Sequence, residues 1–465
     1  MLELIIIIVY FLAVVAIGVL SHQKRWRLDE FMVAGRRYST FFITASLLAT
    51  IIGGSATVGL AGLGFSQGLT GSWWLLVGSI GLIALGLFLA KKVRNFGLYT
   101  LPEIIEKQYD RRVALAASIL IVIAWMGVMA GQILAAGKIL SALGIGSPVL
   151  WMVIFTVIFV GYTIFGGQYA IVRTDVLDVI IIFVGIFAGL GTLLWQTGGL
   201  NGLLNALPAG KLDFPLSSTF GGTDLLSYLL LVGLTYVVGP DIYSRLFCAR
   251  DSRTAVVSVF WTALFLIPFA LGIALIGMGA FVLYPQISPE QAFPALVTGV
   301  FPPFVAGLVL AALVSAIMSS ADAVLLSAGT ILSVDVIGRF RKPTAEKRTL
   351  NLSRWVLLAI GLAALGLALV LNGVINALLF AYTIYTSGVI LPAIAGFYKD
   401  KLKVTSRAAL VAVIGGGLTG LISKALGIKY LDLGALFLSV LLLLIVSLLE
   451  TSLKRGKGGI KYNSE

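Results

Sequence analysis

Long apolar runs, separated by short charged or Gly/Pro/Asn-rich breaks, follow one another along nearly the whole chain. Only 11% of the residues are charged, compared with about 25% in a typical soluble domain. A helix of about 20 apolar residues crosses a bilayer. Of the structures that can cross lipid, helices fit runs of this length. The sequence therefore predicts an all-α polytopic membrane protein and excludes a soluble globular enzyme.

We recognise thirteen such runs and expect each to be a transmembrane helix. They cover approximately residues 3–20, 39–66, 72–90, 113–143, 149–165, 174–196, 225–247, 254–283, 304–335, 355–371, 374–397, 408–423 and 430–450. The first run contains Glu3 and is preceded by no Lys or Arg. A signal peptide needs a positively charged start, so we expect this run to remain as a membrane helix.

Basic residues fall almost entirely on alternate connections between the runs. If the thirteen helices alternate in direction, one set of connections holds 29 of the 33 Lys and Arg residues and the other set holds four. Cytoplasmic loops are enriched in Lys and Arg, so the N-terminus is predicted outside and the C-terminus in the cytoplasm. Topology thus accounts for most of the net charge of +13, and nucleic acid is not expected as a partner.

Two of the runs contain residues that oppose a continuous helix. Gly53-Gly54-Ser55 interrupts 39–66, and Gly239-Pro240-Asp241 interrupts 225–247. Glycine costs about 1 kcal/mol and proline about 3 kcal/mol in a helix interior, so both helices are predicted to be unwound at these points. Each segment alone also fits a simpler interpretation, namely close helix packing through glycines or a proline kink.

The spacing of the two interruptions indicates an inverted internal repeat. They lie five helices apart, and an odd offset gives the two helices opposite directions through the membrane. Matched broken helices are typical of transporters that bind their substrate near the middle of the bilayer. The predicted parts are 1–38 (extra helix and basic cytoplasmic loop), 39–197 (first five-helix repeat), 198–223 (external loop), 224–398 (second, inverted repeat) and 399–465 (two C-terminal helices and a short cytoplasmic tail).

A polar cluster lies within the apolar run 304–335. Ser319 and Ser320 are followed by Asp322, which lies one helical turn from Ser319 on the same face. The serines could simply bond to carbonyls of their own helix, but an acid inside the membrane indicates a functional site. Hard cations prefer several oxygen ligands. Two hydroxyls together with carbonyls of an unwound helix would supply such ligands to sodium.

Four segments together resemble the sodium:solute symporter family. They are A-T-I-I-G-G-S from residue 49, G-G-Q-Y-A-I-V-R-T-D-V-L-D from 166, Y-V-V-G-P-D-I-Y-S-R-L-F from 236 and S-A-I-M-S-S-A-D-A-V-L-L from 315. The resemblance extends from about residue 30 to 400. It implies a LeuT-type fold with one extra N-terminal and two extra C-terminal helices.

The resemblance also implies a sodium site. In the family this site uses two carbonyls of the first broken helix, one carbonyl of the serine-bearing helix and two adjacent hydroxyls. The corresponding residues here are Ala49, Ile52, Ala316, Ser319 and Ser320.

A second set of acids is expected along the ion path. Asp175 corresponds to the family's acid on the inner ion path, which some members use for a second sodium. The partner positions for that second ion are Asp322 and Ala323 here, and because Ala323 departs from the pattern, the number of ions stays open. Asp178 is expected to face the cytoplasmic rim.

The substrate is expected beside the ion, between the two broken helices. Its candidate residues are Gly53, Ser55, Gln132, Tyr236 and Pro240, with a helix-helix hydrogen bond as the alternative role of Gln132. Gly53 and Ser55 would offer backbone amides and a hydroxyl to a carboxylate. Tyr236 and Pro240 match positions in the sodium/proline branch, but Val232 and Ile51 replace a tryptophan and an acid expected there.

The predicted substrate site contains few polar groups. Such a site suits a small, largely apolar molecule with one charged end. We expect sodium-coupled uptake of an amino acid such as proline, or of a monocarboxylate, and favour sugars and vitamins less. A passive channel and a membrane-embedded enzyme are the rival classes, and we expect no enzyme. We expect a multi-pass protein in the lipid bilayer of a prokaryotic plasma membrane, with Na+ as its coupling ion and no obligatory protein partner.

Overall fold

The computed structural model describes residues 2–21, 28–141, 144–340, 346–371, 373–426 and 430–458, and this part of the chain is helical with no named strand. Parts of the predicted basic loop before residue 38 and of the C-terminal tail lie outside the described residues. Ten described helical stretches are long and apolar enough to cross a membrane, and Leu2–Val14 and Thr40–Ile51 are shorter apolar helices. The predicted all-helical membrane class is confirmed, while the count of thirteen spans stays a prediction.

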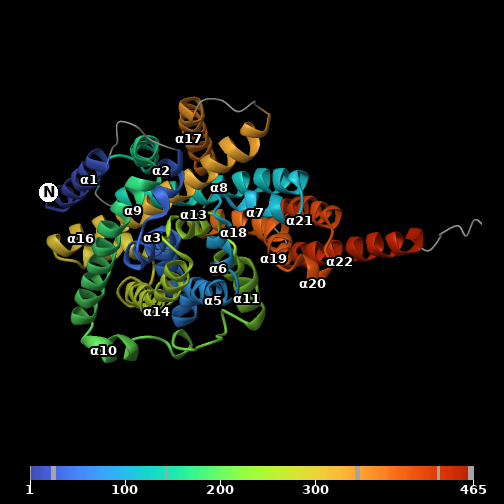
Figure 1. Ribbon diagram of the computed structural model, residues 1–465. Coiled ribbons are helices and arrows are strands. Elements are labelled where there is room, and N and C mark those ends of the chain that lie inside the picture. The colour runs from blue at the N-terminus through green and yellow to red at the C-terminus, as the bar shows by residue number, and fades with distance from the viewer. Residues whose placement is uncertain are drawn as a thin grey trace, which may run out of the picture.

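The helices follow the order of the apolar runs (Figure 1). The principal helices are α1 (Leu2–Ser21), α3 (Thr40–Ile51), α4 (Leu60–Gln67), α5 (Trp73–Phe88), α8 (Arg111–Ser141), α9 (Pro148–Gln196), α14 (Ser252–Leu283), α16 (Pro303–Thr330), α17 (Glu346–Ala368), α18 (Val374–Tyr385), α21 (Ser406–Leu426) and α22 (Leu431–Gly458). The shorter helices are α2 (Leu28–Val33), α6 (Ala90–Phe96), α7 (Leu101–Gln108), α10 (Gly199–Asn205), α11 (Gly222–Ser227), α12 (Leu234–Val237), α13 (Pro240–Cys248), α15 (Ala292–Gly299), α19 (Leu391–Gly396) and α20 (Lys399–Leu402).

The first predicted break is present. α3 ends at Ile51, and Ile52 has backbone angles of φ −80° and ψ 86°, outside the helical region. The chain resumes as a π-helical turn over Ser55–Gly59 before α4 begins. The glycine pair Gly53-Gly54 therefore lies in an unwound segment, as the sequence predicts.

The second predicted break is also present. Val238, with φ −134° and ψ 61°, ends α12, and Gly239 is extended at φ −95° and ψ 124°. Pro240 is the first residue of α13, a position where its missing N–H removes no helical hydrogen bond. The proline therefore starts a new helix rather than kinking a continuous one.

α16 forms the centre of the helix bundle. Every residue from Val309 to Thr330 is buried, which is typical of a helix surrounded by other helices on all sides. Its neighbours include α9, α8, α1, α17 and α3 (Figure 1). The serine-bearing segment therefore faces protein and not lipid.

The predicted loop at 166–173 is wrong. α9 is helical from Pro148 to Gln196, and its one non-helical residue is Gly167, with φ 56° and ψ −170°. Arg173, the basic residue of this segment, lies within the helix, and its guanidinium packs over the Tyr169 ring, 4.3 Å from the ring centroid. The two helical segments of α9 therefore join at a kink at Gly167 and not through a polar loop.

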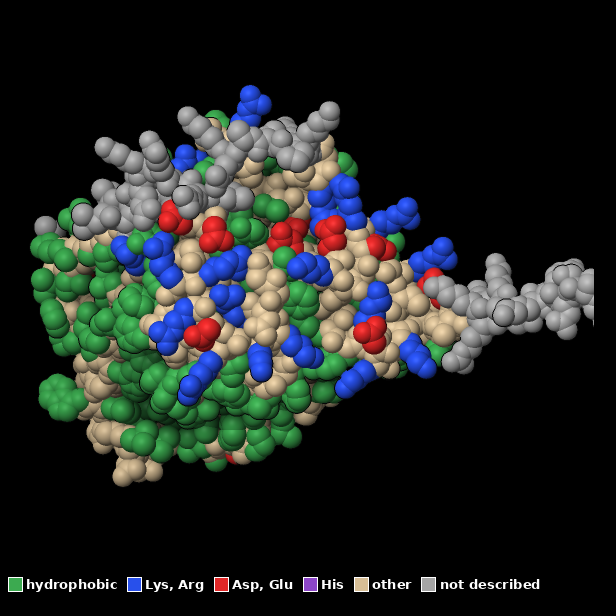
Figure 2. Space-filling view, viewed as in Figure 1, with side chains coloured by type: hydrophobic (Ala, Val, Ile, Leu, Met, Phe, Trp, Pro, Cys, Tyr) green, Lys and Arg blue, Asp and Glu red, His purple; other side chains and the backbone are tan. Residues whose placement is uncertain are grey.

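Charged side chains are unevenly distributed over the face of the molecule that Figure 2 shows. Figure 2 shows Lys and Arg gathered over the region of α6, α7 and α13, with a hydrophobic surface below them. α6 and α7 lie within the connection 91–112, which the sequence assigns to the cytoplasmic side. The one-sided distribution fits the predicted orientation of the chain, which itself stays a prediction.

Replacing Gly167 with alanine is expected to destabilise the protein. Its combination of φ and ψ is open essentially to glycine alone, at a cost of about 1–3 kcal/mol for other residues. A Cβ there would also lie 2.5 Å from the Phe31 ring. The melting temperature in detergent should fall for Gly167→Ala. It should stay the same or rise for Gly161→Ala in the same helix, because alanine is the better helix former and an added Cβ meets nothing within 4 Å there. Equal melting temperatures would contradict this explanation.

Candidate functional site

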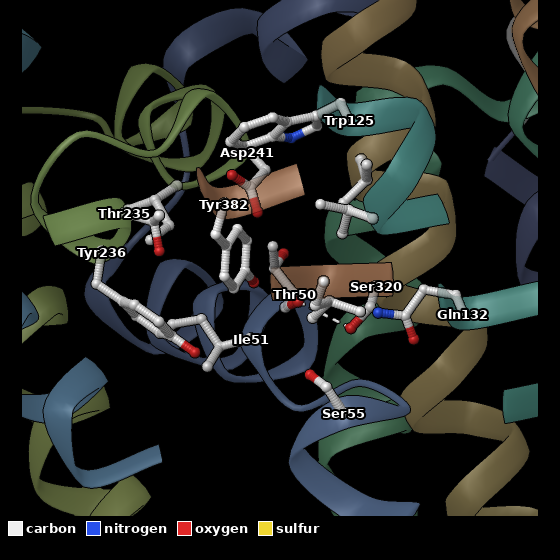
Figure 3. A pocket seen from close by; sticks show the side chains of 14 residues that line it. Thr50, Ile51, Ser55, Trp125, Gln132, Thr235, Tyr236, Asp241, Ser320 and Tyr382 are labelled. Atoms are coloured by element: carbon white, nitrogen blue, oxygen red, sulfur yellow. Dashed lines mark hydrogen bonds between the residues drawn. The ribbon is translucent and has the colours of Figure 1, made fainter. Parts of the chain in front are cut away.

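A cavity lies between the two broken helices and the bundle core (Figure 3). About 40 Å³ of it is open to the centre of a water-sized sphere. Its lining comes from the end of α3, the turn after it, α8, α12, α13, α16 and α18. The lining residues are Thr50, Ile51, Ser55, Trp125, Val128, Gln132, Thr235, Tyr236, Asp241, Ile242, Ser320, Val324, Leu378 and Tyr382.

Three of the five predicted substrate residues line this cavity, namely Ser55, Gln132 and Tyr236. Gly53 does not line it, and its amide donates to the Ile51 carbonyl at 3.0 Å. The expectation that this amide is available to a carboxylate is therefore wrong, because the unwound chain uses it to close its own turn. Pro240 lines a different pocket, together with Gln168, Tyr99 and others.

Gln132 holds the first break in place. Its Oε1 accepts a hydrogen bond from the Gly54 amide at 2.7 Å, so its amide nitrogen is left for the cavity side. Gly53 lies so close that an added Cβ would stand 2.5 Å from Ser320 Oγ and 2.8 Å from Gln132 Nε2. Glycine is required at this position because any side chain would displace both polar groups. Gln132 therefore bonds to the backbone of the unwound segment rather than to a second helix, and it also lines the cavity.

The two serines of α16 reach the end of α3. Ser319 Oγ lies 2.9 Å from the Ala49 carbonyl oxygen and 3.2 Å from that of Ala316. Ser320 Oγ lies 2.8 Å from the Thr50 carbonyl oxygen and 3.3 Å from that of Ala49. Four of the five oxygens in the predicted sodium site, those of Ala49, Ala316 and the two serines, therefore lie together.

The oxygen set fits a hard cation. Ser319 Oγ also lies 2.9 Å from the Ser315 carbonyl oxygen. The serine therefore bonds within its own helix, as the simpler interpretation predicts, and also contacts α3. Ile52, the fifth predicted ligand, is the first residue beyond α3 and has non-helical backbone angles. Its carbonyl is therefore not committed to a continuous helical ladder. Neutral carbonyl and hydroxyl oxygens are ligands that such ions accept.

A buried ionic network lies next to the predicted ion site. Asp175 accepts a hydrogen bond from Ser46 of α3, and one of its oxygens lies 3.7 Å from Arg245 Nη2. Arg245 also donates from Nε to Thr50 Oγ1 and from Nη1 to Gln168 Oε1, both at 3.0 Å. The network ties α3, α9 and α13 together.

Asp322 is buried in α16, and its Oδ1 has no hydrogen-bond partner within the described part of the chain. Asp178 was expected at the cytoplasmic rim, and that expectation is wrong. Its side chain is buried and accepts hydrogen bonds from Tyr10 Oη at 3.0 Å and Ser315 Oγ at 2.7 Å. The two hydrogen bonds replace those that the carboxylate would otherwise make with water. Neither donor is near Asp178 in sequence.

Several site residues were missed in the sequence. Asp241, Trp125 and Tyr382 line the cavity, and Arg245 joins Asp175 to it through Thr50. Asp241 carried a signal that could have identified it, because it is an acid at a predicted helix break inside the membrane. The aromatic residues carried none, since they resemble ordinary core residues of apolar helices.

Comparison with known proteins places these features in a family. The model of the sodium:solute symporter family matches residues 31–416. The chain is 25% identical to a sodium/glucose cotransporter of Vibrio parahaemolyticus, over 95% of this chain and 87% of the relative. It is 27% identical to the high-affinity proline transporter PutP of Bacillus subtilis, over 76% of this chain and 77% of the relative.

The fold has a solved counterpart. The substrate-bound, outward-open structure of a Na+-coupled sialic acid symporter superposes with a TM-score of 0.82 at 18% identity, covering 97% of this chain and 98% of that one. This likeness shows the fold of LeuT-like transporters, with broken helices at the centre of the bundle. The chain belongs to the sodium:solute symporter family, so it is a membrane transporter and not an enzyme, and its coupling ion is sodium.

Proposed function

We propose that this protein uses the sodium gradient across the plasma membrane to take up a small amino acid, such as proline, by alternating access. The observation that carries the proposal is the meeting of the Ser319 and Ser320 hydroxyls with the carbonyls of the broken helix α3, next to the cavity. An ion bound there would contact α3 and α16 at once. Its binding would therefore set the shape of the cavity wall that Ser320 shares.

We assign the sodium ion to Ala49, Ile52, Ala316, Ser319 and Ser320. The clustering of four of these five oxygens supports the assignment. Asp175 and Asp322 are proposed for the ion path or a second sodium. Both are buried, and each has an oxygen without a hydrogen-bond partner among the described residues.

The lining of the cavity suits a small solute. The wall combines aliphatic and aromatic side chains with hydroxyl, amide and carboxyl groups, among them those of Ser55, Gln132 and Asp241, which suits a compact molecule with polar ends. Ser55, Gln132 and Tyr236 are proposed as substrate contacts. Gly53 and Pro240 are proposed to shape the site, since both lie at the breaks but outside the cavity wall. A monocarboxylate fits the same size, and a sodium-coupled sugar or vitamin symporter is the alternative.

Uptake into proteoliposomes tests the function. With an inward sodium gradient, purified protein should accumulate labelled proline or another small amino acid, and replacing external sodium with potassium should abolish the accumulation. One sodium crossing about 100 mV supplies roughly 2.3 kcal/mol, and a tenfold gradient adds about 1.4 kcal/mol. A flux that is independent of either gradient would instead indicate a channel, and accumulation of a sugar alone would select the alternative substrate class.

Removing the two hydroxyls should weaken sodium binding. We expect Ser319→Ala and Ser320→Ala each to raise the sodium concentration for half-maximal uptake at least about tenfold, equivalent to 1.4 kcal/mol, because each loses one oxygen ligand. Ser327→Ala provides a control in the same helix, since Ser327 lines a separate pocket. An unchanged sodium dependence in both variants would contradict the site assignment.

Asp175→Asn should slow transport more than it weakens substrate binding. Asparagine can still accept a hydrogen bond from Ser46, but it removes the negative charge that faces Arg245. Leaving the buried Arg245 cation without its ionic partner is costly. We therefore expect the movements of α3, α9 and α13 during the transport cycle to slow, while the cavity that binds the substrate keeps its shape. The test compares the maximal rate of uptake with equilibrium binding of the substrate. Equal losses in both would argue against a role on the ion path.

A further inference from the structure

The cavity contains one ionisable carboxylate and no basic side chain. Asp241 is the only Asp, Glu, Lys, Arg or His among its lining residues. The side chain keeps part of its surface accessible within the cavity. A carboxylate taken out of water needs a compensating charge or hydrogen bonds. The lining therefore carries a negative charge that a bound solute could match.

The position of Asp241 explains how a charge is tolerated there. It is the second residue of α13, directly after the second break. The N-terminus of a helix stabilises a nearby negative charge. This local effect alone could account for an acid at such a position, but it does not explain why the side chain points into the cavity (Figure 3).

The nearest basic residue on the same helix is engaged elsewhere. Arg245 lies one turn further along α13 and bonds to Thr50, Gln168 and Ser244, with Asp175 as its ion-pair partner. Among the described residues, no Lys or Arg nitrogen forms an ion pair with Asp241. The charge of Asp241 is thus directed to the cavity and that of Arg245 to the inner network.

Aromatic rings accompany the carboxylate. Trp125, Tyr236 and Tyr382 line the same cavity as Asp241 (Figure 3). Cations are attracted to the faces of such rings, most strongly to tryptophan. The Trp125 ring is held by an edge contact with Tyr385 at 4.6 Å between centroids, and the Tyr382 ring is stacked with Trp74 at 6.5 Å. These contacts fix the rings before a ligand binds.

The other side of the cavity is neutral and polar. Ser55, Gln132 and Ser320 lie together there, away from Asp241 (Figure 3). Gln132 presents its amide nitrogen because its oxygen is used by Gly54. A solute spanning the cavity would meet a carboxylate with aromatic rings at one end and hydrogen-bond donors at the other.

We propose that this cavity selects a solute carrying a positively charged nitrogen, held by the Asp241 carboxylate and the faces of Trp125 and Tyr382. The inference rests on the proposed sodium symport and specifies the substrate class of the same site. Amino acids and betaines have the required charge, and a carboxylate group on such a solute would lie at the Gln132 end. A simple monocarboxylate is disfavoured because its only charge repeats that of Asp241.

Matched ligand pairs test the proposal. Purified full-length protein in sodium chloride is mixed with L-proline, glycine betaine or choline. In parallel it is mixed with the carbon isosteres that lack the positive nitrogen, namely cyclopentanecarboxylate for proline, 3,3-dimethylbutyrate for glycine betaine and 3,3-dimethylbutan-1-ol for choline. Binding is measured by thermal shift and by calorimetry. At least one nitrogen cation should bind at least tenfold more tightly than its isostere.

Variants assign the preference to Asp241. Asp241→Asn should reduce affinity for the bound cation at least tenfold, Asp241→Glu should retain part of it, and Tyr382→Leu should reduce it more than Tyr382→Phe. Asp213→Asn, in the exposed loop 206–221, should have no effect. Unchanged stabilisation by sodium alone would show that each variant is folded.

The outcomes separate this inference from the proposed function. Sodium-dependent binding of glucose or of cyclopentanecarboxylate, with no nitrogen cation bound, would overturn the inference and leave sodium symport standing. Binding of a cation with equal affinity by Asp241→Asn would also overturn it, as would failure of every cation in the panel to bind. Tight, Asp241-dependent binding of a cation that is not transported with sodium would support the inference and overturn the proposed function.

Discussion

Backbone groups freed by the two unwound helices have to find hydrogen-bond partners inside the protein, because lipid offers none. Side chains of the surrounding helices provide them. Gln132 of α8 accepts from the Gly54 amide, and Ser320 of α16 bonds to the Thr50 carbonyl. At the second break, Tyr385 of α18 donates to the Val238 carbonyl. The breaks are therefore stabilised by the same core helices that form the cavity wall.

This arrangement links ion binding to substrate binding in the proposed cycle. The hydroxyl of Ser320 bonds to α3 and also lines the cavity. The serine hydroxyls now donate hydrogen bonds to carbonyl oxygens at the end of α3. A sodium ion in the proposed site would compete for these oxygens, so the serine O–H groups would have to rotate toward other acceptors. α13 provides a second link, because it presents Asp241 to the cavity and Arg245 to Asp175 one turn apart. A change at Asp241 or at Arg245 would reach the other residue through one turn of this helix.

The sequence was informative where chemistry conflicts with its surroundings. Gly53-Gly54 and Pro240 oppose a helix within apolar runs, and both breaks are present. The paired serines stand out for the same reason. Asp178 was wrongly predicted to face the cytoplasmic rim. Its partner Tyr10 lies 168 residues away in sequence, and no local sequence pattern indicates their contact. Trp125 and Tyr382 were missed because aromatic residues in apolar helices have no distinguishing spacing.

The contact of Tyr10 with Asp178 also gives the N-terminal helix α1 a physical role. Asp178 of α9 is buried against α16, where a carboxylate would be unstable without hydrogen-bond donors. One donor, Ser315, belongs to α16, but the other comes from α1, which lies outside the predicted repeat. Ile6 of α1 also packs against Gly307, which permits close approach to α16. α1 therefore completes the polar environment of the helix that carries the proposed sodium ligands, and is more than a cover against lipid.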